Sequence, residues 1–315
     1  MTHVPVLLKE VIEILNPEGE PSVPYGAGPQ PGEFFIDGTI GSGGHASEIL
    51  KRISPNGVFL GIDWDKKAIE LAESKLNVKC QMSDVRCYFV HGNYADLPEI
   101  LKEKKLPKAD GLLLDLGFSS EQLNPPAGGG RGFSFLKDEV LDMRYESNKE
   151  RLTAAEIVNS FTEKELADII FKYGEERYSR RIAKAIIEER KKKRILTTFD
   201  LVEIIKKAAP KIYQAGRRHP AMRTFQALRI YVNQELDNLE TILKNINQIS
   251  KIKGRVLIIS LHSLEDRLVK NYFRQMAKDG KAEILTKRPV RPTEEEIEKN
   301  SRSRSAKLRA ISLNY

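Results

Sequence analysis

Two hydrophobic periods alternate along the first 115 residues. Short runs of apolar residues that suit buried strands are separated by stretches in which apolar residues recur every three or four positions, as on one face of a helix. Short strands that alternate with helices form parallel sheets, so we expect an α/β fold with a doubly wound, mainly parallel sheet. The predicted strands are residues 33–37, 58–63, 85–90 and 111–115, and the predicted helices are 6–15, 46–52, 66–76 and 97–103.

The alternation stops after Asp115 and resumes only with a helix at 224–243 and a strand at 255–261. The residues between them begin with a Pro- and Gly-rich run and continue with helical periodicity. We therefore expect a core domain of residues 1–122 and 224–315, interrupted by an inserted helical domain at 123–223. Two capping boxes predict helix starts in the insert, at Thr153 with Glu156 and at Thr162 with Glu165.

Positive charge is concentrated in the insert. The whole chain has 52 Lys and Arg residues against 44 Asp and Glu residues, a net charge of +8. The insert has 22 basic and 15 acidic residues, a net charge of +7, and the runs 191–194 and 217–219 supply much of it. We expect an anionic partner, with nucleic acid as the first candidate and an acidic membrane as the second. The run 191–194 alone would equally suit the solvated end of a helix.

The cysteines, the histidines and the hydropathy indicate the cellular compartment, metal binding and membrane association of the protein. Two cysteines, Cys80 and Cys87, are too few for a zinc site or a disulfide framework and fit a reducing cytosol. Five scattered histidines lack metal-ligand spacing, so we expect no metal. No apolar run reaches the roughly 20 residues of a membrane span, and residues 1–15 do not resemble a signal peptide. We expect a cytoplasmic protein without a membrane partner.

A glycine-rich turn from Asp37 to His45 follows the first core strand. Glycines at a strand-to-helix junction let the backbone approach a ligand closely. Asp63 closes the next strand, 22 residues beyond Gly41, where a carboxylate accepts hydrogen bonds from the ribose hydroxyls of a nucleoside. Together these features predict an adenosine-containing cofactor, although Asp63 would also suit a cap of the helix at 66–76.

Nicotinamide dinucleotide and S-adenosylmethionine both fit such a turn. The glycine spacing departs from the G-x-G-x-x-G pattern that cradles a pyrophosphate. A hairpin of residues 283–286 with 307–313 would add a final antiparallel strand, an ending common in methyltransferases. We therefore expect a Rossmann-like class I methyltransferase fold with S-adenosylmethionine as cofactor. Gly43, Gly44 and His45 should touch the cofactor, whereas Asp37 should shape the turn.

Asp115 ends the fourth predicted strand, where open α/β sheets bind ligands. The turn from Asp115 to Phe118 resembles the Asp/Asn-Pro-Pro-Tyr/Phe turn of amino-group methyltransferases, with Leu-Gly in place of two prolines. An exocyclic base amine is a weak nucleophile because its lone pair is conjugated with the ring, and an acceptor against its N–H hydrogens activates it. Asp115 would be that acceptor, and Phe118 would stack on the base. The alternative is that Asp115 only contacts the cofactor or caps the turn.

His262 follows the strand at 255–261 and is the third catalytic candidate. Its position after that strand places it at the same edge of the sheet as Asp115. A histidine there can orient the substrate or exchange a proton. It would equally serve as a hydrogen-bonded residue that starts the next helix. Both interpretations stay open.

Short motifs occur in order along nearly the whole chain: HVPVLL at 3–8, the turn at 37–45, LDLG at 114–117, RGFSF at 131–135, LDMR at 141–144, YGEE at 173–176, TFQA at 224–227, HSLEDR at 262–267 and RSRS at 302–305. In these motifs the chain resembles the bacterial ribosomal RNA small-subunit methyltransferase H family. The resemblance implies methyl transfer from S-adenosylmethionine to the N4 amine of a cytidine in the decoding centre of 16S rRNA, close to the P site. The implied partner is 16S rRNA within a small ribosomal subunit or a late precursor, and monomer and homodimer both stay open.

The resemblance also assigns residues. Without it, Tyr94 would be interpreted as core packing. The helical insert of the family helps to recognise RNA, which agrees with the basic insert, and an arginine guanidinium can engage phosphate bidentately. The implied cofactor residues are Gly43, Gly44, His45, Asp63, Tyr94, Asp115 and Gln122, and the RNA-contact candidates are Arg131, Arg144, Arg217 and Arg218.

Two other functions are compatible with the same residues. One is a nicotinamide-dependent oxidoreductase that uses the same nucleotide-binding topology. The other is a non-catalytic RNA-binding assembly factor that retains the cofactor pocket. Cofactor preference separates the first from a methyltransferase, and methyl transfer by the wild-type protein separates the second.

Overall fold

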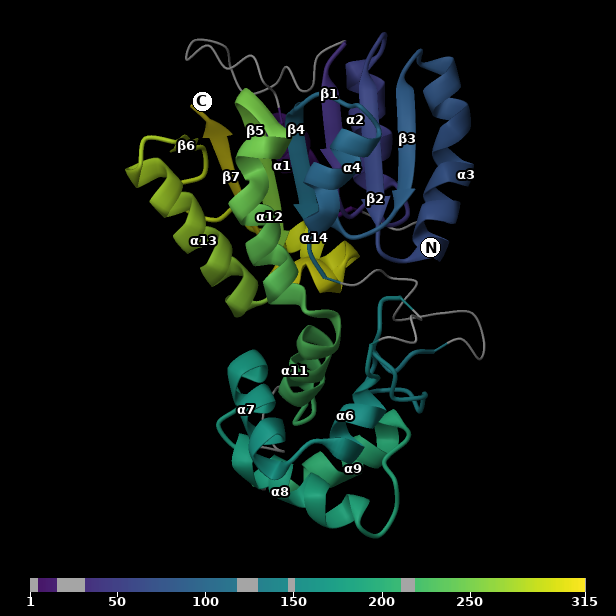
Figure 1. Cartoon of the computed structure of the whole chain (residues 1–315), viewed down its shortest axis with the longest axis vertical. Helices are drawn as coiled ribbons and strands as arrows, with labels where there is room; N and C mark the ends of the chain where they lie inside the picture. Colours follow the sequence, from purple (N-terminus) through teal and green to yellow (C-terminus); the bar gives the residue numbers. More distant parts are fainter. Residues whose placement is uncertain (1–4, 16–31, 118–129, 147–150, 211–218, 315) are drawn as a thin grey trace. The chain divides into compact units, whose positions relative to one another are not determined.

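The computed structural model describes residues 5–15, 32–117, 130–146, 151–210 and 219–314. It contains a seven-stranded sheet in the order β3-β2-β1-β4-β5-β7-β6, in which β7 runs antiparallel to both of its neighbours (Figure 1). The predicted α/β class, the mainly parallel sheet and the final antiparallel strand are confirmed. The strands are β1 (Phe34–Asp37), β2 (Val58–Asp63), β3 (Arg86–His91), β4 (Ala109–Asp115), β5 (Ser250–Ser260), β6 (Ala282–Ile284) and β7 (Lys307–Leu313).

Helices cover both faces of the sheet because alternate strand residues point to opposite sides. Phe35 packs in one core with Val11 and Ile49, whereas its neighbour Ile36 packs in a second core with Leu239. No helix in the described part of the chain is long and apolar enough to cross a bilayer. The helices that cover the sheet or border it are α1 (Leu8–Ile14), α2 (Gly44–Ile53), α3 (Lys66–Met82), α4 (Leu97–Glu103), α12 (Glu235–Ile249), α13 (Ser263–Lys278) and α14 (Glu294–Lys299), with short 3-10 turns η1 (Tyr94–Asp96) and η2 (Ser301–Ser305).

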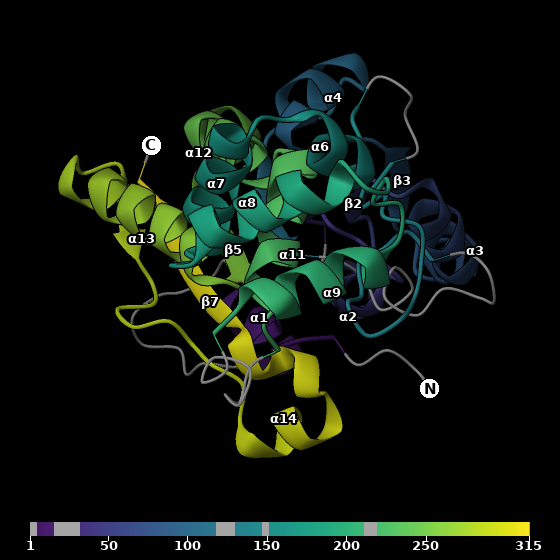
Figure 2. The same cartoon turned by 90° about the horizontal axis from the view of Figure 1, so that it is seen from below.

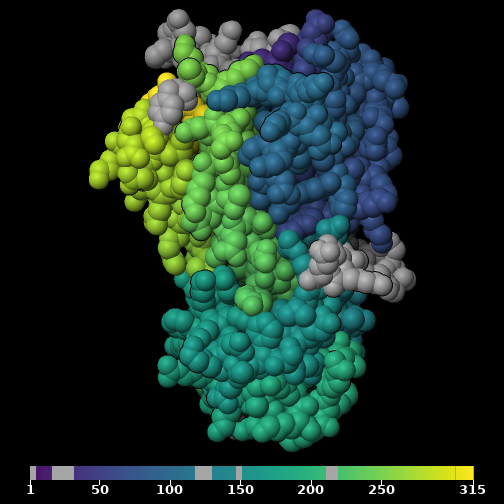
Figure 3. Space-filling view, in the orientation of Figure 1, coloured from purple at the N-terminus to yellow at the C-terminus, as the bar shows by residue number. Residues whose placement is uncertain are grey.

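The chain divides into two compact units. One consists of residues 1–117 and 236–315 and contains the sheet. The other, here called the helical unit, consists of residues 118–235 and is drawn in teal and green in Figure 3. Its limits lie at 118 and 235, whereas the sequence pattern places the insert at 123–223. Figure 2 shows its helices, α6 (Ala154–Ser160), α7 (Glu163–Gly174), α8 (Ser179–Arg190), α9 (Thr198–Ala208) and α11 (Met222–Asn233).

The helix expected at 224–243 is in fact two helices. Gln234, between α11 and α12, has a left-handed conformation with a φ of 51°. A left-handed residue turns the backbone out of the helical path, so the prediction of one continuous helix is wrong. The predicted capping boxes are confirmed, because the side chains of Thr153 and Thr162 cap α6 and α7.

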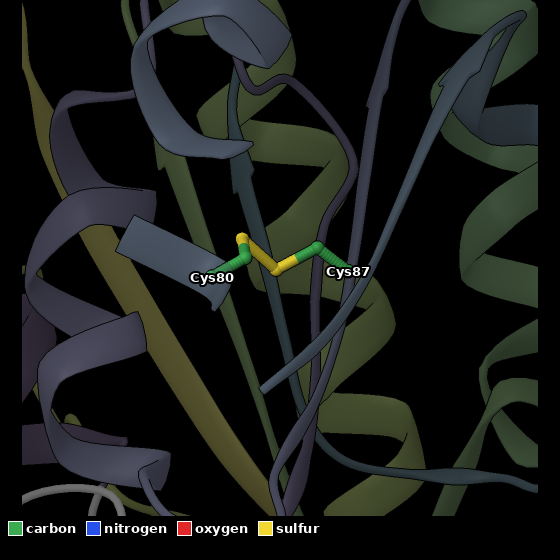
Figure 4. Close-up of a disulfide and its surroundings, with 2 residues drawn as sticks. All are labelled: Cys80 and Cys87. Carbon is green, nitrogen blue, oxygen red and sulfur yellow. A yellow bond between two sulfur atoms is a disulfide. The ribbon is translucent and has the colours of Figure 1, made fainter. Parts of the chain in front are cut away.

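Cys80 and Cys87, too few for a disulfide framework, nevertheless form one disulfide with each other (Figure 4). Cys80 lies in the last turn of α3, and Cys87 is the second residue of β3. The chain reverses direction in the short turn between these elements, which brings the two Cα atoms to 6.2 Å, within the range for a disulfide. The bond ties the end of α3 to the start of an edge strand of the sheet.

Candidate cofactor and active site

Three neighbouring strands bring the predicted carboxylates together. β1 lies between β2 and β4, and all three run in parallel. Asp37, Asp63 and Asp115 are their last residues and therefore lie at the same edge of the sheet. Ligands of open α/β sheets bind outside this carboxyl edge.

Gly43 and Gly44 occupy positions where a side chain would clash. Gly43 has a φ of 81°, and a Cβ atom there would lie 2.9 Å from Leu76 Cδ1. A Cβ atom on Gly44 would lie 2.5 Å from Cγ of Pro5. Gly43 is also the N-cap of α2, and the first N–H groups of a helix lack intrahelical acceptors. The turn thus presents a close-packed backbone at the positive end of a helix dipole, which suits a carboxylate or another oxygen-rich ligand.

Asp63 is tied to the glycine turn. Its Oδ2 accepts a hydrogen bond of 2.9 Å from the N–H of Gly41, and its Oδ1 accepts one of 2.9 Å from the N–H of Asp65. Burial raises the pKa of Asp63 to about 6, although these two N–H donors act to lower it. The N–H of Trp64 also bonds this carboxylate and lowers its pKa, which leaves acceptor capacity for a ribose hydroxyl.

The alternative interpretation of Asp63 as a helix cap is wrong. The N-cap of α3 is Asp65, whose side chain accepts a hydrogen bond from the N–H of Lys67. Both aspartates lie in the same short connection, so the sequence pattern did not separate them. Because Asp65 caps the helix, the carboxylate of Asp63 at the end of β2 is available for a ligand.

His45 anchors the N-terminal segment to the glycine turn. Its side chain is buried, and its Nε2 lies 2.9 Å from the backbone oxygen of Val6. The next residue, Leu7, has a left-handed φ of 54° and donates its N–H to Glu296 Oε1 over 2.7 Å. The imidazole therefore holds the segment around Val6 against the glycine turn. A cofactor contact by His45 fits its backbone N–H in the first turn of α2.

Tyr94 lies beside the turn. It begins η1, where the side chain of Asn93 caps the backbone by accepting the N–H of Ala95 over 3.0 Å. A Cβ atom on Gly38 would lie 3.2 Å from Cβ of Tyr94 and 2.5 Å from Cδ2 of Leu114. Tyr94 is thus packed against the start of the glycine turn. This packing is possible because residue 38 is a glycine, which has no side chain to separate the two.

Asp115 is connected to the glycine turn through Thr39, a residue that sequence reasoning missed. The N–H of Asp115 donates to Thr39 Oγ1 over 2.7 Å, and the N–H of Thr39 donates to Asp37 Oδ1 over 3.1 Å. Burial, together with the nearby carboxylates of Asp37 and Glu265, raises the pKa of Asp115 to about 8. Burial also raises the pKa of Asp37 to about 7, against hydrogen bonds from Thr39. The sequence did offer one signal for this role, since Thr39 places a hydroxyl group only two residues after Asp37.

His262 is the N-cap of α13. The N–H of Glu265 donates to His262 Nδ1 over 3.4 Å, and the N–H groups of Leu261 and His262 donate to Glu265 Oε2 over 2.9 and 3.2 Å. His262 Nε2 lies 3.1 Å from Glu265 Oε1. This reciprocal capping box favours the interpretation of His262 as a residue that starts a helix over its interpretation as a proton carrier.

Arg131 and Arg144 are engaged within the helical unit. Arg131 Nη1 donates to the backbone oxygen of Tyr145 over 2.8 Å, and its guanidinium lies 5.7 Å from the ring centre of Phe133. Arg144 forms a bidentate pair with Asp142, with Nε and Nη2 donating over 2.7 and 2.9 Å. These guanidinium groups hold the fold of residues 130–146. Four other predicted site residues lie outside the described part of the chain: Phe118, Gln122, Arg217 and Arg218.

Comparison with known families accounts for this combination of glycine turn and strand-end carboxylates. The profile of the MraW methylase family matches residues 1–314. The chain belongs to this family. Its relatives in the family include ribosomal RNA small subunit methyltransferase H of Thermotoga neapolitana, 45% identical over 314 residues that cover 99% of this chain and 96% of the relative. The protein of the same name from Clostridioides difficile is 43% identical over 324 residues, covering 98% and 97%.

Solved structures resemble this MraW family member at low identity. A putative rRNA-methylase from Clostridium thermocellum is 9% identical with a TM-score of 0.42, and the likeness covers 90% of each chain. Fibrillarin from Aeropyrum pernix in complex with S-adenosylmethionine is 10% identical with a TM-score of 0.39, covering 90% of this chain and 67% of that one. The family assignment rests on the full-length profile match and on the relatives above 40% identity.

Proposed function

We propose that this member of the MraW methylase family transfers a methyl group from S-adenosylmethionine to the exocyclic N4 amine of a cytidine in the decoding centre of 16S rRNA. Relatives at 43% and 45% identity carry the name ribosomal RNA small subunit methyltransferase H, which supports ribosomal RNA as the substrate. The observation that carries the proposal is the position of Asp63 and Asp115 on either side of β1 and its glycine turn. A nucleoside-binding carboxylate and an amine-directed carboxylate thereby share one site.

The residues present fit S-adenosylmethionine. Leu76 and Pro5 pack directly against Gly43 and Gly44, so the backbone at the start of α2 is held in place, and its first N–H groups can receive the amino-acid end of the cofactor. Asp63 retains acceptor capacity for the ribose hydroxyls, and Tyr94 packs against the same turn. Bound here, the cofactor supplies a methyl group that its sulfonium already activates.

Asp115 performs the acid-base part of the reaction. Its carboxylate accepts a hydrogen bond from the cytidine amine, which localises the nitrogen lone pair. When the amine nitrogen takes up the methyl group that the cofactor would supply, the proton that the nitrogen loses would pass to Asp115. A carboxyl with a pKa of about 8 is a stronger base than an ordinary aspartate, and Thr39 fixes the main chain that carries it. Orientation of the two reactants provides much of the remaining rate.

The partners follow from the substrate. The RNA would be recognised within a small ribosomal subunit or a late precursor, in the bacterial cytoplasm. The helical unit, which contains most of the net positive charge, would provide the RNA-recognition surface. Ordinary electrostatic attraction between basic side chains and phosphates supports this assignment.

Mapping the methylated nucleotide tests the proposal. Small subunits from a bacterial strain that lacks this protein are incubated with the purified protein and labelled S-adenosylmethionine, and the rRNA is digested and analysed by mass spectrometry. We expect one labelled cytidine in the decoding centre, with the label on N4. Label on a different RNA, on DNA or on a protein would overturn the substrate assignment.

Two controls address the alternative functions. In calorimetry, tight binding of NAD without binding of S-adenosylmethionine would identify an oxidoreductase instead. A wild-type protein that binds small subunits and S-adenosylmethionine but never transfers the methyl group would be an assembly factor. We expect binding of S-adenosylmethionine and transfer of its methyl group.

A further inference from the structure

The helical unit exposes an apolar patch. In the described part of the chain nine large hydrophobic side chains are exposed, and four of them lie where residues 136–140 meet residues 196–199. Their exposed fractions range from 44% to 71%, so these are open side chains and not the edges of a core. Such clusters commonly mark binding surfaces. The patch consists of Leu136, Val140, Leu196 and Phe199.

Backbone contacts fix the two segments of the patch against one another. Val140 forms an antiparallel bridge with Thr197. The N–H of Leu141 donates to the backbone oxygen of Leu196 over 3.0 Å, and the N–H of Phe199 donates to Asp138 Oδ1 over 3.3 Å. Residues nearly 60 positions apart in the chain are therefore held side by side just before and at the start of α9.

A run of four cationic side chains borders the patch. The exposed run 191–194 directly precedes it and connects α8 to α9. Lys192 pairs with Glu189 over 2.9 Å, and Lys193 pairs with Asp200 over 3.0 Å. For the side chains of Lys191 and Arg194, the contacts among the described residues include no hydrogen bond and no ion pair.

The acidic groups nearest to the patch are already engaged. Asp200 accepts the N–H groups of Leu196 and Thr197 in addition to its pair with Lys193. Asp138 accepts the N–H of Phe199. These hydrogen bonds and the ion pair with Lys193 partly neutralise the two carboxylates, so the border of the patch stays positive.

We propose that this surface, formed by Lys191, Arg194 and the apolar patch, binds a single-stranded segment of the substrate RNA. The inference rests on the proposed function and assigns a place to its RNA contacts. Single-stranded nucleic acid is bound by cations that follow the phosphates and by an aromatic side chain on which a base stacks. Lys191 and Arg194 offer the cations, and Phe199, five residues beyond Arg194 in the chain, offers the aromatic ring. The net charge of +7 on residues 123–223 favours an anionic occupant over a basic ribosomal protein.

This assignment differs from the one suggested by the sequence motifs. Arg131 and Arg144 were the described RNA-contact candidates, but their guanidinium groups already bind Tyr145 and Asp142. Contact with phosphate would require these bonds to break. Among the described residues, the side chains of Lys191 and Arg194 have no such bonds to lose.

Charge-reversal variants with a matched control test the cationic part. The test variant is Lys191→Glu with Arg194→Glu, and the control is Arg180→Glu with Arg181→Glu. All four residues are exposed, both variants change the net charge equally, and Arg180 lies about 16 Å from Lys191 along α8. We expect the test variant to raise the KM for small subunits about tenfold or more, to leave kcat unchanged at saturating RNA, and to flatten the salt dependence of binding. The control should change the KM by much less.

Phe199→Ala tests the stacking part, with Phe171→Ala as control because Phe171 is exposed at 63% on α7. Affinity for a single-stranded oligonucleotide of rRNA sequence should fall about fivefold or more for Phe199→Ala and stay unchanged for the control. A duplex RNA of equal length should bind both variants alike. Circular dichroism and the Tm of each variant verify that it is folded.

Specific outcomes would overturn the inference. Equal losses in the test and control variants would show a general effect of charge, and unchanged KM and RNA affinity would show that RNA does not touch the surface. Binding of a ribosomal protein that is lost in the variants while RNA affinity is kept would assign the surface to protein. A wild-type protein that binds RNA through this surface without methylating it would sink the proposed function and leave the inference standing.

Discussion

At the scale of single residues, Thr39 links the cofactor side of the site to the substrate side. Its Oγ1 accepts the N–H of Asp115 over 2.7 Å, and its own N–H donates to Asp37 Oδ1 over 3.1 Å. One hydroxyl thus fixes the main chain of the proposed base relative to the glycine turn. Neither Gly43 nor Asp63 depends on this hydroxyl, so its contribution can be measured separately from cofactor binding.

Replacing Thr39 with Val removes the hydroxyl and keeps the shape of the side chain. We expect kcat to fall about tenfold, because one hydrogen bond of about 1.5 kcal/mol then no longer holds Asp115. The Kd for S-adenosylmethionine, measured by calorimetry, should stay close to the wild-type value. Thr39→Ser should restore most of kcat. Equal loss of kcat and cofactor affinity in Thr39→Val, without rescue by Ser, would mean that Thr39 merely supports the turn.

Asp115 gives the reaction a pH dependence. Burial raises its pKa to about 8, so below that pH most molecules carry the neutral acid, which accepts a proton poorly. We expect kcat/KM to rise about tenfold per pH unit up to roughly pH 8 and then to level off. The Asp115→Asn variant should be strongly impaired and should lack this rise. A wild-type profile that is flat between pH 6 and 9 would contradict the assignment of Asp115 as base.

The same shift bears on stability. Because the folded pKa lies above the unfolded value of 3.8, the folded state binds more protons between these two pH values. The free energy of unfolding contributed by this group is therefore largest below pH 4 and is lost as pH rises through about 8. Burial of Asp115 thus makes its carboxylate a stronger base and lowers the free energy of unfolding at neutral pH.

At the scale of elements, helix starts explain several residues that resemble catalytic ones. Asp65 caps α3 beside the cofactor carboxylate Asp63, and His262 caps α13 at the edge of the sheet where Asp115 lies. Helix starts and ligand sites share this edge in α/β sheets, because each parallel strand is followed there by a helix. Polar residues at the edge therefore need the structure to separate caps from ligand contacts.

Two substitutions of His262 separate capping from proton transfer. His262→Ala should lower the free energy of unfolding by about 1 kcal/mol, because the N-cap acceptor of α13 is lost. His262→Asn supplies another cap acceptor and should keep most of the stability. Urea denaturation measures both effects. We expect kcat of the Asn variant to stay near the wild-type value, and a loss of kcat in both variants at unchanged stability would restore His262 as a catalytic residue.

At the scale of the whole molecule, charge and chemistry lie in different parts of the chain. The carboxylates of the candidate site belong to the unit that contains the sheet, whereas residues 123–223 supply +7 of the net charge of +8. The proposed cofactor site depends on short, fixed contacts at the ends of β1, β2 and β4. Binding of RNA through basic side chains depends on ionic strength.

Salt should therefore affect the two substrates differently. Raising the salt concentration from 50 to 200 mM should increase the KM for small subunits about tenfold or more, since counterions compete with the basic side chains for phosphate. The Kd for S-adenosylmethionine should change little over the same range. Steady-state kinetics at saturating cofactor and calorimetry without RNA measure the two quantities. A KM for RNA that does not respond to salt would contradict a recognition surface based on charge.

The sequence by itself determined the α/β class, the helical insert, the glycine turn and the strand-end carboxylates. Each of these depends on local periodicity or on residues close together in the chain, such as Asp37 to His45. The family motifs placed Tyr94 beside them, and the structure packs it against Gly38. Local physics was sufficient at these positions because the type of each secondary-structure element largely follows from the pattern of apolar residues.

Only the tertiary structure decided which residues meet. The hydrogen bond from Asp115 to Thr39 joins residues 76 positions apart, and the apolar patch joins residues 136–140 to 196–199. The break at Gln234 and the disulfide between Cys80 and Cys87 depend on backbone turns that periodicity does not report. Side-chain roles at the edge of the sheet were undecided for the same physical reason, because a hydrogen bond between distant residues exists only once the strands have aligned them.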